Sequence, residues 1–232
     1  MKIAIISDVH GNYDALSAFP ESYDELWVLG DLVNYGPQPK EVVDFVRDNA
    51  TVVVRGNHDQ CIGYGDDPRC SQRFREMAEA TRRFTEAVVT MNQRLYLCSF
   101  PLKLNLVREQ TRFLLCHATP SDPLYEYRTE ESEKWADESA RLPADIILVG
   151  HTHIPFVRSF DGRTVVNPGS LGQPKTGKPE ACYAVWENGR LDLRTYSYPV
   201  GKTAEKIRRM PVNSLIQQKL ISVLECGGIP PQ

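Results

Sequence analysis

The five histidines of this chain lie where chemistry can be expected. His10, His58, His117, His151 and His153 each stand at the end of a short apolar run or just after it. Imidazole nitrogens bind transition metals and also exchange protons near neutral pH. A scatter without function would place some of these side chains on surface helices. Their shared position therefore predicts a common site that uses imidazole chemistry.

Acidic and amide side chains accompany the histidines. The clusters are Asp8-Val9-His10, Gly30-Asp31, Gly56-Asn57-His58-Asp59, His117, and Gly150-His151-Thr152-His153. If the clusters converge, so many buried polar groups need strong partners, and metal ions are the natural ones. Mixed imidazole and carboxylate ligands favour zinc, manganese, iron or nickel over calcium or magnesium. The donors outnumber the roughly four to six ligands of one such ion, so the clusters predict two divalent ions.

Two divalent ions predict a particular reaction. Ions about 3.5–4 Å apart can polarise a phosphoryl group and generate a hydroxide between them for in-line attack on phosphorus. Two carboxylate ligands and a hydroxide leave such a site with a net positive charge, which attracts a phosphate. The expected chemistry is hydrolysis of a phosphate ester.

Five short β-rich runs precede the clusters and must position them. They are Lys2–Ile6, Glu25–Leu29, Thr51–Val54, Phe113–Cys116 and Asp145–Val149. Uninterrupted runs of this kind favour strands buried on both faces, as in a layered α/β protein. Helical patterns at Asn12–Phe19 and Pro39–Asp48 separate the first three runs. Because the carboxyl ends of parallel strands meet at one edge of a sheet, the clusters are expected to converge there.

The other segments predict a helical insert and a meander. Apolar residues recur at helical spacing from about Ser71 to Asn92, which predicts one long amphipathic helix within an insert or cap at 60–100. Further helices are expected over Thr129–Arg141 and near Val212–Leu224, the latter in a C-terminal helical tail at 200–232. Strands are expected at Phe156–Ser159, Thr164–Val166, Ala181–Trp186 and Leu191–Ser197. Without a repeat or a clear linker, residues 1–232 are expected to form a single domain.

Composition narrows the class of protein. The chain has 232 residues, of which 41% are hydrophobic and 25% charged, which is ordinary for a globular protein. Its 27 basic and 30 acidic residues give a net charge of −3, which argues against stable nucleic-acid binding. The sequence contains no apolar run near the ~20 residues of a membrane span and no signal peptide. The six cysteines lack C-x-x-C spacing, so reduced thiols and a cytoplasmic location without membrane association are expected.

The order of the clusters is similar to that of a known family. The set D-x-H, G-D, G-N-H-D, H and G-H-T-H resembles the calcineurin-like metallophosphoesterase superfamily over residues 8 to 153, and the similarity continues through Asn167-Pro168-Gly169-Ser170. The resemblance implies a four-layer α/β/β/α sandwich of two mixed sheets. It implies that one metal is held by Asp8, His10 and His153, that the other is held by Asn57, His117 and His151, and that Asp31 bridges both.

The resemblance also implies a proton donor. His58 would face the substrate and protonate the leaving oxygen, and Asp59 would orient the His58 ring by a hydrogen bond. For Asp59, a solvated position or a helix cap is the alternative.

One segment departs from the protein Ser/Thr phosphatases of the superfamily, which carry an arginine soon after G-D. Asn34 and Tyr35 stand in that context here. The segment, together with residues 117–125, resembles a small prokaryotic branch of phosphodiesterases and diadenosine-polyphosphate-hydrolase-like proteins. The expected substrate is therefore a small phosphodiester or nucleotide. A phosphomonoesterase or protein phosphatase is the alternative, and a non-catalytic scaffold or a DNA nuclease is less favoured.

Several residues near the motifs have two interpretations. Tyr64, Tyr125, Tyr127 and Arg128 could stack a base or only pack their loops. The arginines of residues 69–83 could meet a polyphosphate or form a solvated helix face with the neighbouring glutamates. Asn167, Gly169 and Ser170 could build a turn or face the substrate. Cys116 is expected to point away from His117 into the core.

Overall fold

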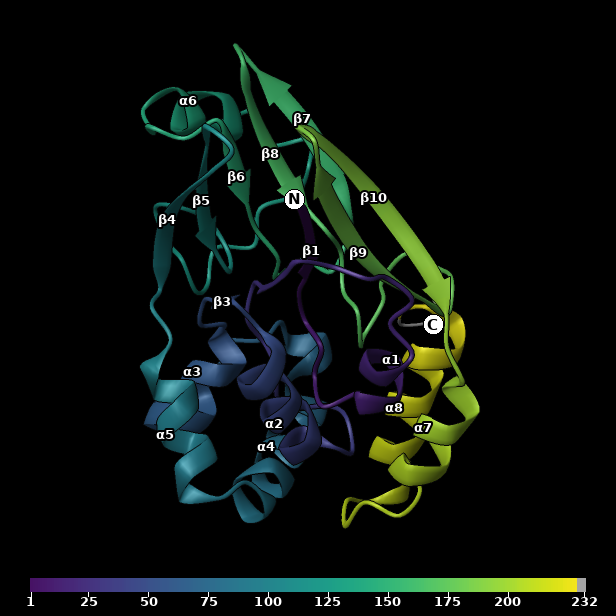
Figure 1. Cartoon of the computed structure of the whole chain (residues 1–232). Helices are drawn as coiled ribbons and strands as arrows, with labels where there is room; N and C mark the ends of the chain where they lie inside the picture. Colours follow the sequence, from purple (N-terminus) through teal and green to yellow (C-terminus); the bar gives the residue numbers. More distant parts are fainter. Residues whose placement is uncertain (229–232) are drawn as a thin grey trace.

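Two mixed five-stranded sheets form the centre of the computed structural model, which describes residues 1–228 (Figure 1). The last four residues of the predicted C-terminal tail lie outside the described residues. The first sheet has the order β10-β9-β1-β2-β3. Its strands are β1 (Lys2–Ile6), β2 (Glu25–Val28), β3 (Val52–Val53), β9 (Glu180–Glu187) and β10 (Arg190–Ser197). The second sheet has the order β4-β5-β6-β8-β7. Its strands are β4 (Lys103–Arg108), β5 (Thr111–Cys116), β6 (Ile146–Leu148), β7 (Phe156–Phe160) and β8 (Arg163–Asn167).

Each sheet has three parallel strands at its centre or along one side. Strands β1, β2 and β3 run parallel, and β9 and β10 extend that sheet in antiparallel pairing. Strands β5, β6 and β8 run parallel, flanked by antiparallel β4 and β7. The five strands that precede the motifs are therefore confirmed, and so are the four short strands predicted after His153.

The inner faces of the two sheets share one apolar core. Its centre is aromatic: the ring of Phe113 makes edge contacts with Trp27 and Trp186 at centroid separations of 5.0 and 5.4 Å. All three side chains are buried, and they come from both sheets. Burial of this kind stabilises the sandwich and leaves only the strand ends for polar chemistry.

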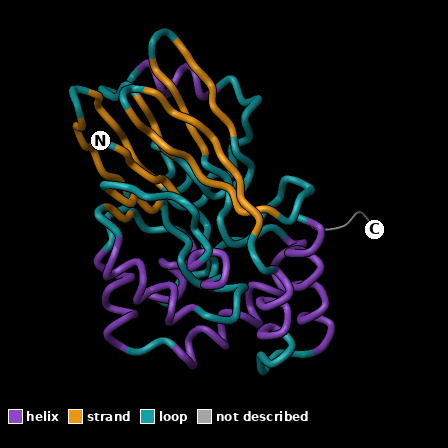
Figure 2. The backbone as a smooth tube through the Cα atoms, turned by 45° about the vertical axis from the view of Figure 1, so that its right-hand side comes forward, coloured by secondary structure: helices purple, strands orange, loops and turns teal. Residues whose placement is uncertain are grey.

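Helices cover both outer faces of the sandwich. Helices α1 (Tyr13–Ser17), α2 (Pro39–Asn49) and α5 (Met91–Ser99) pack on the first sheet, and α6 (Lys134–Ala140) packs on the second. This arrangement confirms the α/β/β/α layers. Figure 2 shows the strands together in one half of the molecule and most helices in the other.

The predicted long helix from Ser71 to Asn92 is wrong. Helix α4 (Gln72–Val88) ends at Val89, whose backbone is extended, and α5 begins after Thr90. The Oγ1 of Thr90 accepts a hydrogen bond from the Gln93 backbone N–H at 3.2 Å, and the Gln93 side chain accepts one from the Thr90 N–H at 3.0 Å. This capping box starts a new helix. Apolar periodicity continues across the break, so only the T-x-x-Q signal marked it.

Thr90→Ala is expected to lower the free energy of unfolding by about 1 kcal/mol, because an N-cap hydrogen bond is lost. Thr90→Ser keeps the hydroxyl and is expected to stay close to the wild type. Urea denaturation of the three proteins measures the difference. Equal destabilisation by both substitutions would mean that the methyl group, and not the cap, is what matters.

Other elements differ in extent. The helix predicted over Thr129–Arg141 is limited to α6. The Thr129 carbonyl accepts from the Ser132 N–H at 3.3 Å and from the Trp135 indole at 2.9 Å, which closes a turn instead of a helical ladder. Helices α3 (Asn57–Tyr64) and α7 (Val200–Ile207) and strand β4 were not predicted. Helix α8 (Ser214–Cys226) confirms the predicted C-terminal helix and packs with α4 and α7.

Within residues 1–228, no helix is both long and apolar enough to cross a membrane.

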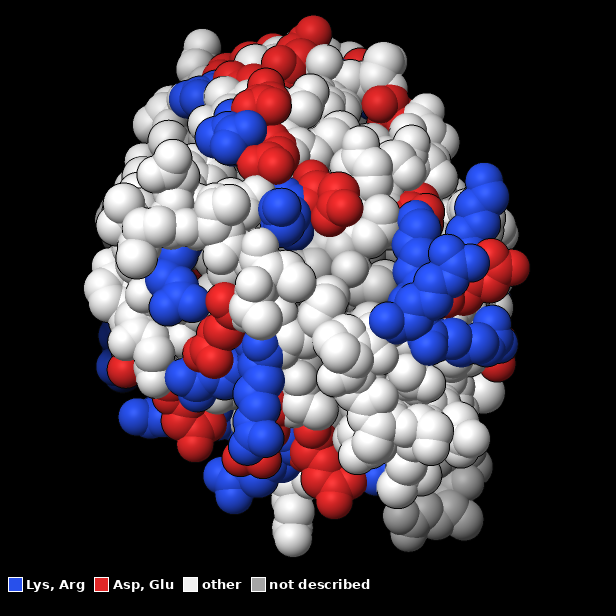
Figure 3. All heavy atoms as spheres, turned by 90° about the horizontal axis from the view of Figure 1, so that it is seen from below, with Lys and Arg blue, Asp and Glu red and all other residues white. Residues whose placement is uncertain are grey.

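The solvated-face interpretation of α4 agrees with its ion pairs. Arg82 pairs with Glu86 at 2.9 Å, and Lys219 of α8 pairs with Glu76 at 2.7 Å. Seen from below, basic side chains gather in two regions of the surface, and acidic side chains lie beside them in both (Figure 3). This face therefore mixes both signs of charge.

Candidate active site

The loops that follow the parallel strands of both sheets meet at one edge of the sandwich. These loops carry Asp8 after β1, Asp31 after β2, Asn57 after β3, His117 after β5, and His151 and His153 after β6. Every histidine and carboxylate predicted for the site is brought together here. The convergence has the reason expected from the sequence, since parallel strands present their carboxyl ends to the same edge.

The backbone of this edge is unusual. Five of the predicted ligands have a positive φ between 47° and 64°, which non-glycine residues adopt only at some cost. These residues are Asp8, His10, Asp31, His151 and His153. Hydrogen bonds between loops hold the conformation: the Asp8 N–H donates to Gly30 O at 3.0 Å and the His10 N–H to Asp31 O at 2.9 Å. The strain is thus maintained by neighbouring strands and marks a functional site.

Two motif glycines are required by close packing. A Cβ at Gly56 would lie 2.1 Å from the Asp31 carboxylate, and one at Gly150 would lie 2.1 Å from Ser7 Oγ. Any larger residue would push the ligand loops apart. The absence of a side chain at these two glycines of G-N-H-D and G-H-T-H therefore leaves room for the side chains of the Asp31 and Asp8 loops.

The first group of possible metal ligands is Asp8, His10 and His153. The Nδ1 atoms of His10 and His153 lie 3.0 and 2.7 Å from the carbonyls of Val33 and Gln173, so each Nδ1 carries the proton. Burial lowers the pKa of both rings. Each Nε2 is therefore unprotonated and offers its lone pair. These Nε2 atoms face each other at 3.2 Å.

A carboxylate completes this group. Asp8 Oδ1 lies 3.2 Å from His153 Nε2 and is buried without a hydrogen-bond partner among the described residues. Burial by itself raises the pKa of Asp8. The interactions with His153 and His117 lower it by more, so the net pKa is below the usual value and the carboxyl is ionised. Three acceptors therefore converge with no proton between them. A cation fits this arrangement, and the set of two imidazoles and one carboxylate suits a transition metal.

The second group is Asp31, His117 and His151. His117 Nδ1 lies 2.7 Å from Leu29 O, which directs Nε2 toward Asp31 Oδ2 at 3.3 Å. Burial lowers the pKa of His117, but Asp31 outweighs it and raises the value to about 9. Burial, reinforced by His117, lowers the pKa of His151 to about 3. A metal ion can take the place of the His117 proton here, because it satisfies the same carboxylate.

Asn57 presents an oxygen to the second group. Its amide nitrogen donates to Pro68 O at 2.7 Å, which fixes the amide so that Oδ1 points to the imidazoles. Oδ1 lies 3.0 Å from His117 Nε2 and 3.1 Å from His151 Nδ1. The amide thus adds a neutral oxygen to the ligand set.

His58 lies at the wall of the site, outside both ligand groups. Its Nδ1 is 2.7 Å from Asn34 Nδ2, and its Nε2 is 3.4 Å from Cys70 Sγ. Burial lowers the pKa of His58, but the interactions with Cys70 and Asp31 outweigh it and raise the value to about 9. The protonated ring is therefore favoured here, as a general acid requires.

The predicted hydrogen bond between Asp59 and the His58 ring is wrong. The Asp59 carboxylate accepts instead from the backbone N–H groups of Asp31, Leu32 and Gly56, at 2.8, 2.9 and 3.0 Å. Asp59 is the third residue of α3, so its side chain turns back to the helix start and caps it. The capping alternative is confirmed, and the carboxylate locks the Asp31 loop against α3.

Asn34 takes the place of Asp59 beside His58. The sequence indicated Asn34 only as part of the departure from the protein phosphatases. Its φ of 67° turns the side chain toward α3. Its buried Oδ1 has no hydrogen-bond partner among the described residues. A half-turn of the amide would let Oδ1 accept from the protonated Nδ1, so Asn34 can support His58 in either protonation state.

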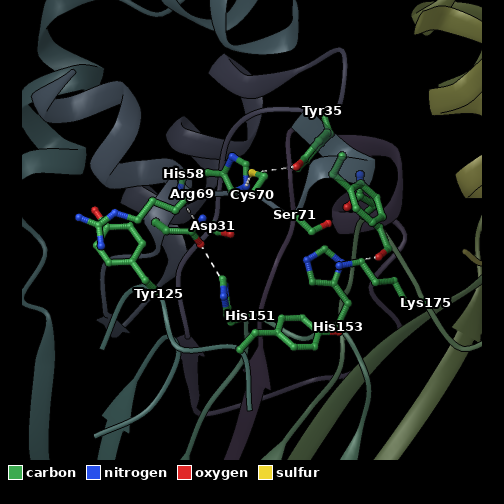
Figure 4. A pocket seen from close by; sticks show the side chains of 14 residues that line it. Asp31, Tyr35, His58, Arg69, Cys70, Ser71, Tyr125, His151, His153 and Lys175 are labelled. Atoms are coloured by element: carbon green, nitrogen blue, oxygen red, sulfur yellow. Dashed lines mark hydrogen bonds between the residues drawn. The ribbon is translucent and has the colours of Figure 1, made fainter. Parts of the chain in front are cut away.

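A pocket opens over both ligand groups (Figure 4). Its walls combine aromatic and basic side chains: Tyr35, Phe74, Tyr125, Tyr127, Arg69 and Lys175. The Arg69 guanidinium lies 4.2 Å from the centre of the Tyr125 ring. Two of the side chains considered for stacking lie elsewhere: Tyr64 donates to Cys98 O at 3.0 Å, and Arg128 pairs with Glu126 and Glu138. Sequence reasoning missed Lys175 and Phe74, which lie outside the motifs.

The segment after β8 supports the ligand loops. Asn167 Nδ2 donates to Gly150 O at 2.6 Å, and Ser170 Oγ donates to Asp8 O at 2.7 Å. These contacts favour the interpretation that Asn167, Gly169 and Ser170 build a turn over the one in which they face the substrate. Cys116 is buried in the outer core of the second sheet, as predicted.

Comparison with known proteins agrees with this geometry. Residues 1–189 match the model of the calcineurin-like phosphoesterase superfamily domain. A metallophosphoesterase from Sphaerobacter thermophilus has a similar structure, with a TM-score of 0.83 and 30% identity, covering 98% of this chain and 99% of that one. The phosphodiesterase YfcE of Escherichia coli is 26% identical and covers 83% of this chain and 91% of YfcE.

A third relative matches over part of its length. The symmetrical bis(5'-nucleosyl)-tetraphosphatase of Vibrio parahaemolyticus is 32% identical over 130 residues, which are 51% of this chain and 44% of that protein. The chain belongs to the calcineurin-like phosphoesterase superfamily and is a metal-dependent hydrolase of phosphate esters.

Proposed function

We propose that this protein hydrolyses small phosphodiesters or nucleotides at a dinuclear metal centre. The observation that carries the proposal is the pair of ligand groups at the floor of one pocket, with His58 at its wall. The names of two relatives, a phosphodiesterase and a nucleosyl tetraphosphatase, support the substrate class.

The residues divide between two ions in this proposal. One ion would be held by Asp8, His10 and His153, and the other by Asn57, His117 and His151. Asp31 would serve both, and its Oδ2 supports that role because it lies 3.7 Å from His10 Nε2 and 3.3 Å from His117 Nε2. Divalent manganese, iron, zinc or nickel fits this donor set.

When bound, two such ions supply Lewis-acid polarisation of the phosphoryl oxygens and an activated water as nucleophile. His58 donates a proton from Nε2 to the leaving oxygen, and Asn34 holds the opposite ring nitrogen. Asp59 fixes the backbone of Asp31 and Leu32, so it acts as a positioning residue. Tyr35, Tyr125 and Tyr127 line the pocket in which the leaving group would lie.

The pocket supports a small substrate in preference to a phosphoprotein. Asn34 and Tyr35 stand in the sequence context in which a protein phosphatase of the superfamily carries its arginine, and the Tyr35 ring packs on His10 and His58 at centroid separations of 4.9 Å. Aromatic walls offer stacking surface to a nucleobase or an aryl group.

We also propose that the chain is a single domain that works in the cytoplasm. Strand β9 pairs with the first strand, β1, so one sheet joins parts of the chain that are far apart in sequence. All six cysteines are free, as expected in a reducing compartment.

A substrate panel tests the proposal. With manganese present, kcat/KM is expected to be higher for bis-p-nitrophenyl phosphate or diadenosine tetraphosphate than for a phosphoserine peptide. The same panel with EDTA is the control and should show no turnover. If the phosphopeptide or p-nitrophenyl phosphate has the highest kcat/KM, the substrate class is wrong.

A further inference from the structure

Lys175 is a cation in the pocket that the proposed mechanism does not use. It lies on the loop after β8, two residues beyond Gln173, whose carbonyl accepts from His153 Nδ1. The side chain is partly buried and lines the pocket with Asp31 and His58. The loop therefore delivers a positive charge to the edge of the metal site.

The Lys175 ammonium has no counter-charge within ion-pair distance. Its Nζ lies 4.6 Å from the centre of the Phe74 ring. Among residues 1–228, Nζ forms no ion pair within 4.0 Å and no hydrogen bond, and Asp8 and Asp31 act on it only at longer range. Burial lowers the pKa of Lys175 to about 8, although Asp8 and Asp31 oppose the shift. A half-buried cation that contacts an aromatic ring but no anion is costly unless a ligand supplies the anion.

The position of Lys175 suggests which anion. Figure 4 shows Lys175 on one side of the pocket and Arg69 with Tyr125 on the other, with Asp31 and His58 between them. The phosphate under attack must lie over the ligand groups in the middle. A group bound by Lys175 is then a second anion, beside the first and not in its place.

We propose that Lys175 binds the phosphate next to the scissile one, so that nucleotides with two or more linked phosphates are preferred over single-phosphate esters. The inference rests on the proposed function and refines its substrate class. An ammonium is a compact charge that suits a phosphate oxygen, and the Phe74 ring lies beside the Lys175 Nζ in the pocket.

Binding to the metal-loaded, full-length protein tests this inference. The probes are AMP and adenosine 5'-(α,β-methylene)diphosphate, whose methylene bridge resists hydrolysis, titrated in a calorimeter at fixed free manganese. A charge-assisted contact is worth about tenfold or more in affinity. The wild type is therefore expected to bind the diphosphate at least tenfold more tightly than AMP.

Substitutions assign the preference to one side chain. Lys175→Met is expected to bring the affinity ratio close to one, and Lys175→Arg to retain a preference. Lys178→Met is the matched control, because Lys178 is exposed on the same loop, and it should keep the wild-type ratio. Thermal melting of each variant checks that it is folded.

Some results would overturn the inference. A wild type that binds both probes equally has no second phosphate site. A Lys175→Met protein that loses affinity for both probes alike would place Lys175 at the scissile phosphate. Failure of the wild type to hydrolyse any diester or dinucleotide refutes the proposed function instead, and the binding ratio still decides the role of Lys175.

Discussion

Asp31→Asn is expected to empty both metal positions together and to lower kcat by about 10³-fold or more. The change replaces a charged oxygen with a neutral amide of nearly the same shape. Oδ2 of Asp31 lies between His10 and His117, at 3.7 and 3.3 Å from their Nε2 atoms, so each ion loses the same ligand. Metal ions supply several kcal/mol of transition-state stabilisation, and about 1.36 kcal/mol corresponds to tenfold in rate.

Elemental analysis of the purified protein measures this effect. The wild type is expected to hold two divalent ions per chain, and Asp31→Asn close to none at the same free metal concentration. Asp192→Asn is the matched control, because Asp192 is exposed on β10, far along the chain from every motif, and should keep both ions. Loss of one ion only would show that Asp31 serves a single position.

His58→Ala is expected to lower kcat by about 10²–10⁴-fold while both ions stay bound. An alkoxide leaves poorly unless it is protonated, and a positioned general acid contributes a factor of this size. His58 is the one histidine absent from both ligand groups of the described residues. Its ring is held by Asn34 on one side and faces the pocket on the other.

The leaving group tests the role more specifically. The loss of rate should be smaller for an aryl phosphodiester, because a phenolate departs with little protonation. His117→Ala is the comparison: it should lose metal together with activity, since His117 faces Asp31 and Asn57. If His58→Ala also releases a metal ion, His58 is a ligand and the division of the histidines is wrong.

The sequence by itself determined the strands and the order of the motifs. Each parallel strand is a short apolar run, and each predicted ligand follows such a run directly. Burial on both faces requires the continuous apolar character of β1, β2 and β5, so their pattern is visible without the fold. The polar residues must lie at the strand ends, since no other part of a buried strand reaches water.

Only the tertiary structure decided which polar groups meet. Asp59 is adjacent to His58 in sequence, yet the helix start directs it to the Asp31 loop. Asn34 is 24 residues from His58 and reaches it because β2 and β3 are neighbours in one sheet. Side-chain hydrogen bonds depend on how distant segments pack, and sequence proximity carries little information about that.

The same reason explains the pocket and the broken helix. Phe74 of α4 and Lys175 of the loop after β8 are about one hundred residues apart, and neither belongs to a motif. Apolar periodicity reports which face of a segment is buried, and it continued through Val89 because the side chain of Val89 is itself buried at the break. It does not report where the chain changes direction or which loops close over a site, because those follow from the packing of whole layers.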